Sequence, residues 1–141
     1  PGWARGVQVF ANVTSQRRTG QPVGNSGFNF FPRRGSWGVS LTRPQYSVRA
    51  NWNYRGERRG ALTSGASIGP DTYTWIPSRV TRDAQAEWVF SRRLAVFGSL
   101  RNLTNVTDDQ LIYGPQTPGP ARFRNRIDYG SLWTFGVRGT F

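Results

Sequence analysis

The stretch YSVRANWNYR, Tyr46–Arg55, alternates more strictly than any other part of the chain. Every second residue from Tyr46 is apolar or aromatic, and the residues between them are serine, arginine or asparagine. A period of two is typical of a β-strand whose two faces meet different surroundings. The stretch therefore predicts a strand with Trp52 on an apolar face and with Arg49 and Asn51 on a polar face.

Five further stretches repeat this period, and glycine and proline interrupt every window that could form a helix. They predict strands at about 3–14, 36–42, 79–90, 94–103 and 128–141. With the strand at 46–55, the fold class is all-β: an antiparallel sheet of about six strands.

The connections between the predicted strands differ sharply in length. Tight turns occupy 43–45 and 91–93, whereas the segments 15–35, 56–78 and 104–127 are long and rich in glycine, proline and arginine. Long structureless segments are uncommon in compact soluble domains. Short turns at one end and long loops at the other are typical of transmembrane β-barrels of the outer membrane. The predicted fold class is therefore a segment of a transmembrane β-barrel, with long extracellular loops and short periplasmic turns.

The two tight turns also predict the register of the strands that they join. Across them the apolar residues are expected to pair as follows: Leu41 with Val48, Val39 with Ala50, Trp37 with Trp52, Phe90 with Leu94, and Trp88 with Val96. On the other face, this register sets Asp83 opposite Arg101 and predicts an ion pair between them.

The large aromatic residues of the apolar face gather at the two ends of the predicted strands. Two aromatic girdles at the depth of the membrane boundary are expected of a barrel in lipid. The predicted lipid-facing girdle residues are Trp37, Tyr46, Trp52, Tyr54, Trp88, Phe90, Tyr129 and Trp133. A β-sandwich core is the alternative interpretation, since sandwich strands also alternate.

The composition narrows the possible functions. The formal net charge is +12, and all 19 basic residues are arginine. Cysteine and histidine are absent, which removes thiol chemistry, the commonest general base and the commonest metal ligands. No apolar run approaches the roughly 20 residues of a membrane helix. Asp108 and Asp109 are adjacent, but no third metal ligand accompanies them in the sequence. We therefore expect that the protein is not an enzyme and has no cofactor and no metal site.

The polar face and the long loops carry the charged candidates. Residues expected to face a wet barrel lumen are Arg49, Asn51, Arg79, Asp83, Glu87 and Arg101. Loop arginines expected to contact phosphate or ligand are Arg33, Arg34, Arg58, Arg59, Arg122, Arg124 and Arg126. Guanidinium groups bind phosphate in a bidentate manner. These loops could therefore bind lipopolysaccharide phosphates or an anionic substrate, or they could simply form a charged surface.

A basic β-domain that binds single-stranded nucleic acid is a rival interpretation. That mode needs aromatic rings and arginines on the same face of a sheet. Here Trp52 and Tyr54 alternate with Arg49 and Arg55, so they are expected on opposite faces. This placement argues against nucleic acid as a partner.

Three segments resemble the C-terminal barrel strands of TonB-dependent outer-membrane receptors: WTFGVRGTF at the end of the chain, GSLRNLTN before the last long loop, and SVRANWNYRG. The resemblance implies that residues 1–141 are the C-terminal portion of a larger receptor barrel, without the plug domain and the N-terminal strands. The implied location is the bacterial outer membrane. The implied role is to supply wall and extracellular loops for TonB-energised uptake of a nutrient ligand.

The resemblance also implies partners. They are the rest of the barrel and its plug, the TonB complex acting through that plug, lipopolysaccharide, and a small-molecule or glycan ligand. The barrel-assembly machinery would read a signal at Thr134, Gly136 and Phe141. Gly139 departs from the family pattern, in which a bulkier hydrophobic residue is usual. A small pore closed by self-association of several copies is a further alternative.

Overall fold

The computed structural model describes residues 5–17, 19 and 31–139 and is built almost entirely from antiparallel strands. The strands are β1 Val7–Ser15, β2 Arg33–Thr42, β3 Tyr46–Arg55, β4 Arg58–Leu62, β5 Tyr73–Ile76, β6 Arg79–Ser91, β7 Leu94–Arg101, β8 Asp108–Tyr113, β9 Phe123–Ile127 and β10 Leu132–Gly139. One short 3-10 helix, Gly119–Arg122, precedes β9. No helix in this part of the chain is long and apolar enough to cross a membrane.

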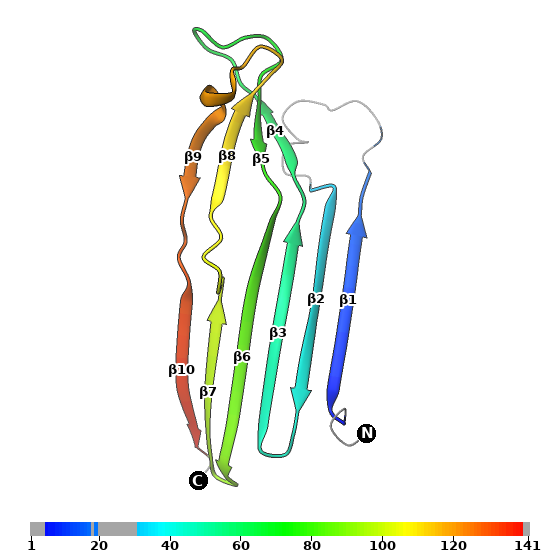
Figure 1. The fold of residues 1–141 in the computed structure, drawn as a ribbon, viewed down its shortest axis with the longest axis vertical. Coiled ribbons are helices and arrows are strands. Elements are labelled where there is room, and N and C mark those ends of the chain that lie inside the picture. Colours follow the sequence, from blue (N-terminus) through cyan, green and yellow to red (C-terminus); the bar gives the residue numbers. More distant parts are fainter. Residues whose placement is uncertain (1–4, 18, 20–30, 140–141) are drawn as a thin grey trace.

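The six strands predicted from alternation form one sheet in the order β1-β2-β3-β6-β7-β10 (Figure 1). Every pair of neighbours is antiparallel, so the predicted fold class is confirmed at the level of an all-β antiparallel sheet. The sheet is open in the described residues, with β1 and β10 at its two edges. Its strands are long, and β2 and β3 have 10 residues each.

The strand ends differ from the predictions where the backbone turns sharply. The last strand begins at Leu132 rather than at residue 128, because Asp128 accepts a hydrogen bond from the amide of Gly130, whose φ is 68°. Glycine adopts this left-handed conformation at little cost, so the chain bends there. β7 ends at Arg101 because Asn102 is also left-handed, with φ of 52°. The first strand begins at Val7 rather than at residue 3, because Arg5 and Gly6 form a turn in which Gly6 has φ of 78°. Residues 3, 4, 140 and 141 of the predicted strands lie outside the described residues.

The predicted register is confirmed across the first turn, where Leu41, Val39 and Trp37 pair with Val48, Ala50 and Trp52. Across the second turn Trp88 pairs with Val96 as predicted. The prediction that Phe90 pairs with Leu94 is wrong. An irregularity between Val89 and Ser91 sets Ser91 opposite Leu94, as expected where one extra residue enters a strand beside a turn.

The prediction of long structureless loops is wrong for two of the three segments. Residues 56–78 contain β4 and β5, and residues 104–127 contain β8 and β9. These strands form a second sheet in the order β4-β5-β8-β9. Figure 1 shows that they lie above the six-stranded sheet, beyond the upper ends of β3, β6, β7 and β10. The third segment, 15–35, lies mostly outside the described residues.

The described residues form no hydrophobic core. Their only buried hydrophobic residues are Ile76 and Ala95, and no side chain among them is fully buried. Large apolar side chains are instead exposed along the whole sheet, with Trp133 at 59% and Phe135 at 71% of their full accessibility. The β-sandwich alternative would require these residues to be covered by a second layer, which the described residues do not supply.

Candidate functional site

The register divides the six-stranded sheet into two chemically different faces. Residues directly opposite one another share a face. One continuous row across all six strands is apolar: Val9, Val39, Ala50, Ala84, Leu100 and Trp133. The adjacent row, on the other face, is polar: Gln8, Ser40, Arg49, Gln85, Ser99 and Thr134. The sheet therefore has an apolar face and a polar face.

Aromatic side chains on the apolar face form two rows. Near the long hairpins, Trp37 and Trp52 are directly opposite each other. Near the short turns, Tyr46 stacks on Trp88 with ring centroids 5.7 Å apart. Tyr46 and Trp52 are six residues apart on β3, so the two rows are separated by ~20 Å at ~3.3 Å per residue.

The remaining predicted girdle residues are less regular. Phe90 lies beside Trp88, with ring centroids 6.4 Å apart. Tyr54 pairs with Gly35, one step beyond the upper aromatic row. Trp133 pairs with Leu100 in the middle of the sheet. Tyr129 lies in the extended segment between β9 and β10, outside the predicted strand.

All six residues predicted to face a lumen lie on the polar face. In adjacent strands Arg49 is opposite Gln85 and Asn51 is opposite Asp83. The predicted ion pair between Asp83 and Arg101 is wrong. Asp83 instead accepts hydrogen bonds from the Asn53 side chain at 3.1 Å and from the Asn102 amide at 3.0 Å. These nearer donors already occupy both of its oxygens.

Two other predicted polar-face residues do form ion pairs. Glu87, near the short turns, pairs with Arg138 of β10. Arg79, at the opposite end of β6, pairs with Asp108 at 3.2 Å.

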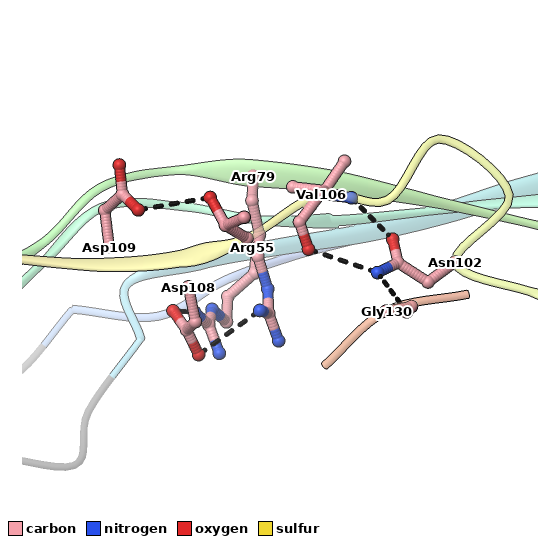
Figure 2. Close-up of polar contacts among 8 residues, drawn as sticks. Arg55, Arg79, Asn102, Val106, Asp108, Asp109 and Gly130 are labelled. Carbon is pink, nitrogen blue, oxygen red and sulfur yellow. Dashed lines mark hydrogen bonds and ion pairs between the residues drawn. The ribbon is translucent and has the colours of Figure 1, made fainter. Parts of the chain in front are cut away.

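An arginine cluster occupies the junction between the two sheets. Arg34, Arg55 and Arg79 are directly opposite one another on neighbouring strands, an arrangement of like charges that is unfavourable by itself. Asp108 compensates part of this repulsion, with one oxygen 2.6 Å from Arg55 and the other 3.2 Å from Arg79 (Figure 2). Its side chain is only 18% exposed. We call Arg34, Arg55, Arg58, Arg79, Asp108 and Phe31 the junction cluster.

The Phe31 ring organises the guanidinium groups of this cluster. The guanidinium carbons of Arg34, Arg55 and Arg58 lie 4.8, 4.9 and 4.5 Å from the centroid of that ring. Desolvation by burial lowers the pKa of Arg58, and the positive charge of Arg55 lowers it further, although Asp108 opposes this. Four arginines against one carboxylate leave the junction cluster with a formal charge of +3, so it is suited to bind an anion.

Asn102 holds the segment that delivers Asp108 to the junction. Its side-chain amide donates to the carbonyl groups of Val106 at 3.1 Å and Gly130 at 3.0 Å, and its oxygen accepts from the Val106 amide at 2.9 Å (Figure 2). Beside it, the Thr107 hydroxyl donates to Asp109 at 3.1 Å. Sequence reasoning missed Asn102. The sequence feature that could have indicated its role is an asparagine at the end of a predicted strand, since asparagine tolerates a left-handed backbone there.

A second group of arginines lies on aromatic rings of the four-stranded sheet. Arg59 lies over Tyr73 at 4.5 Å and Arg122 over Tyr113 at 5.1 Å, and Tyr113 stacks on Trp75 at 5.0 Å. These five residues line one cavity of about 550 Å³. We call them the hairpin cluster.

The electrostatics of the hairpin cluster are mixed. Asp71 also lines its cavity. Desolvation by burial raises the pKa of the Tyr113 hydroxyl, and the negative charge of Glu57 adds to this effect, whereas Arg122 opposes it. The Trp75 indole N–H is buried and has no hydrogen-bond partner. The cavity thus offers cationic, anionic and neutral polar groups beside stacked rings.

Alternation along β8 relates the two clusters. Asp108 reaches the polar face, so Asp109, Leu111 and Tyr113 lie on the opposite side, which continues the apolar face. Asp109 there accepts a bidentate pair of hydrogen bonds from Arg126, at 2.7 and 2.8 Å. These hydrogen bonds lower the pKa of Asp109 and raise that of Arg126.

The structure thus divides the predicted loop arginines among different partners. Arg34 and Arg58 belong to the junction cluster, and Arg59 and Arg122 to the hairpin cluster. Arg124 donates to the Thr74 hydroxyl at 3.2 Å. Arg33 is exposed at the start of β2. Arg126, being paired with Asp109, is the least available of the set for a further anion.

Two residues of the predicted assembly signal, Thr134 and Gly136, lie in β10, the edge strand. Phe141 lies outside the described residues. Gly136 is opposite Phe97, whose ring would come within 2.4 Å of a Cβ atom at that position. The glycine is therefore required by packing within the sheet itself.

No group of three acidic, cysteine or histidine side chains in the described part of the chain is placed to hold a metal ion. No protein-family model, curated protein or solved structure matches the chain.

Proposed function

We propose that this chain forms part of the wall and outer hairpins of a TonB-dependent receptor barrel in a bacterial outer membrane. The apolar face would meet hydrocarbon, and the polar face would line a water-filled interior. In such a receptor the chain contributes to TonB-energised uptake of a nutrient ligand. The plug, the remaining strands and the TonB complex would be its partners.

One observation carries the proposal: a six-stranded sheet whose two faces have opposite polarity, with neither face covered by another part of the described chain. Soluble monomers rarely expose contiguous apolar patches larger than a few hundred Å². Here the exposed apolar residues run through every strand, from Val9 at 76% exposure on β1 to Val137 at 66% on β10. Contact with hydrocarbon would remove the free-energy cost of exposing these side chains to water, without a second protein layer.

The dimensions agree with this placement. The aromatic rows at Trp37–Trp52 and at Tyr46–Trp88 are separated by ~20 Å, close to the ~25 Å apolar band of outer-membrane barrels. Two cations of the six-stranded sheet lie on its apolar face, Arg33 and Arg82. Arg33 starts β2, four residues beyond Trp37, and Arg82 pairs with Trp52 in the aromatic row near the long hairpins. A guanidinium at that depth reaches the headgroups rather than the hydrocarbon.

The open edges favour a larger barrel. Unpaired backbone groups along β1 and β10 would be costly in lipid, where no water can satisfy them. Further strands of the same receptor would pair with both edges and close the wall.

The arginine clusters suit an anionic ligand. The junction cluster lies on the polar face, where it could contact the plug or a ligand passing through the barrel. The hairpin cluster continues the apolar face beyond the upper aromatic row, at the height of lipopolysaccharide phosphates. A small anionic or glycan ligand is the alternative occupant of the hairpin cluster.

The proposal is tested with the full chain and lipid vesicles. We expect the chain to sediment with phosphatidylethanolamine–phosphatidylglycerol vesicles and to resist extraction by alkaline carbonate. Brominated acyl chains should quench tryptophan emission, and the quenching should fall in the variant W133F. A monodisperse monomer that is soluble without lipid, with Trp52, Val96 and Trp133 protected from solvent, would overturn the proposal.

The receptor assignment has its own test. Native mass spectrometry of the assembly purified from bacterial outer membranes should detect this chain bound, covalently or not, to further receptor strands and a plug. Uptake by cells should require an intact TonB complex. A closed ring of identical copies of this chain would favour the self-associating pore instead.

Nucleic-acid binding remains a second candidate because of one feature of the hairpin cluster. Arg59 and Arg122 lie on the same face as Tyr73, Trp75 and Tyr113, and this mixing of arginine with rings suits base stacking. The six-stranded sheet lacks this mixing of arginines with rings, since Trp52 and Arg49 lie on opposite faces. Binding of single-stranded DNA without lipid, weakening steeply with salt, would support this candidate.

A further inference from the structure

An apolar cavity of about 750 Å³ lies on the apolar face, near the short turns. Its floor is formed by Ala86 and Gly98, which are directly opposite each other on β6 and β7. Tyr46 and Trp88 flank it on one side, and Phe135 and Val137 flank it on the other. The neighbouring positions in the row are larger residues, Val48 and Phe135, so the two small residues create the hollow.

The walls of this cavity are exposed and unoccupied by other parts of the described chain. Trp88 is 50% exposed, Phe135 71% and Val137 66%. The Tyr46 and Trp88 rings are held rigid by their mutual stacking at 5.7 Å. The Phe135 ring carbons would lie 3.1 Å from a Cβ atom at Gly98, so that side of the hollow is defined by a fixed ring as well.

Positive charge lies directly below the cavity. Arg92 and Arg93 form the turn between β6 and β7, whose residues Trp88 and Val96 line the hollow. Both are exposed, and neither guanidinium has a hydrogen bond or ion pair with the part of the chain that the structure describes. The distance along β6 from Trp88 to this turn is ~10 Å.

Among the described residues, no carboxylate forms an ion pair with Arg92 or Arg93. Glu87 is the acidic residue closest to them in sequence, but it lies on the polar face and pairs with Arg138. Arg43, in the neighbouring turn, adds a third cation at this end of the sheet. The hollow is apolar, and the arginines lie at its rim, while the polar face lies on the other side of the sheet. This arrangement suits an amphiphile with one anionic headgroup.

We propose that this hollow binds one acyl chain of an anionic phospholipid whose phosphate is held by Arg92 and Arg93. The site rests on the proposed membrane placement and adds lipid selectivity to it. An acyl chain needs no hydrogen bonds, and most of the lining residues are apolar. Glu87 also borders the cavity, but its carboxylate is paired with Arg138. A peptide in the same hollow would leave its backbone amides unsatisfied. Arginines near an anionic headgroup favour it by charge.

The test uses the full chain inserted into vesicles of equal phosphatidylethanolamine and phosphatidylglycerol, then released gently for native mass spectrometry. We expect one retained phosphatidylglycerol per chain. A86L fills the floor of the hollow and should remove that adduct. A84L is the matched control: Ala84 lies on the same strand and face, one row outside the cavity, and this variant should retain the lipid.

The headgroup contact is tested separately. R92Q/R93Q should still retain a lipid, but its preference for phosphatidylglycerol should fall by roughly 30-fold, because two cationic contacts are removed. R124Q, at the far end of the molecule, should leave the preference unchanged.

The outcomes separate the two proposals. If the chain inserts into vesicles but A86L and A84L retain lipid equally, the acyl-chain site is wrong and the membrane placement stands. A dimer in place of the lipid adduct would assign the hollow to a second copy and overturn the lipid site. If the chain does not insert at all, both proposals fail.

Discussion

Single side chains decide the shape of the wall where its strands end. Asn102 illustrates this: one amide group makes three hydrogen bonds, and these hold the segment before β8 against the segment before β10. The residue also adopts a left-handed backbone with φ of 52°, which asparagine tolerates better than most residues. The position of Asp108 in the junction cluster depends on this contact.

Replacing Asn102 by alanine should therefore be costly. We expect N102A to lower the free energy of unfolding by about 2–3 kcal/mol, since each lost hydrogen bond contributes about 1 kcal/mol. Urea denaturation in detergent or vesicles would measure this change. Asn125, on β9, makes no side-chain hydrogen bond among the described residues, so N125A should change the free energy of unfolding little. Equal effects of the two substitutions would contradict the structural role of Asn102.

The pairing of Asp109 with Arg126 gives a pH dependence at the outer hairpins. The hydrogen bonds from Arg126 lower the pKa of Asp109 in the folded chain, whereas the unfolded value is about 4. A depressed folded pKa contributes stability that is present above the unfolded pKa and is lost as pH falls through the folded one.

We therefore expect the amides of β8 and β9 to lose hydrogen-exchange protection as pH falls below about 4. The effect should be small because both side chains are solvated, Arg126 at 56% exposure. D109N should remove this pH dependence. If the variant keeps the same acid transition, the pair is not its cause.

At the scale of elements, alternation and tight turns predicted the six long strands well. Strand β3 was predicted with its observed bounds, and the Trp37–Trp52 pair with its observed register. Short strands escaped prediction, because β5 has only four residues and β8 begins with two aspartates. Too few residues remain there for a period of two to be distinguished from a loop. Tertiary pairing, rather than local preference, makes them strands.

The junction cluster could not be predicted either. Arg55 and Asp108 are 53 residues apart in sequence, and only the pairing order β3-β6-β7 brings them together. Sequence reasoning identified Arg34 and Arg58 as loop cations, placed Arg55 and Arg79 on the polar face, and left Asp108 without a role. Its partners are set by the hairpin that follows Asn102.

Close packing of phenylalanine against glycine links β7 to the edge strand. A Cβ atom at Gly136 would meet the Phe97 ring at 2.4 Å, closer than real contacts allow. We expect G136A to destabilise the β7–β10 pair by about 1–3 kcal/mol, as overpacking does. The double variant G136A/F97V should recover most of that loss, which a double-mutant cycle of unfolding free energies would measure. Additive losses would show that the ring does not oppose the added methyl group.

For the whole molecule, the two faces of the sheet make opposite demands on charge. Ala84 lies on the apolar face in the middle row, and its neighbour Gln85 lies on the polar face. In a membrane, A84R should destabilise the inserted state by about 2–4 kcal/mol, whereas Q85R should be tolerated. Urea unfolding from vesicles measures both. Similar effects of the two variants would contradict the assignment of the apolar face to hydrocarbon.

The outer hairpins are extensions of the wall rather than slack connections, because β4, β5, β8 and β9 pair in their own sheet above β3, β6, β7 and β10. A binding surface on such hairpins, as proposed above, would be held in shape by paired backbone before a ligand binds. Association there forfeits little chain entropy. If the proposed ligand binds there, association should need no slow ordering step, so differences in affinity between ligands should lie mainly in their dissociation rates.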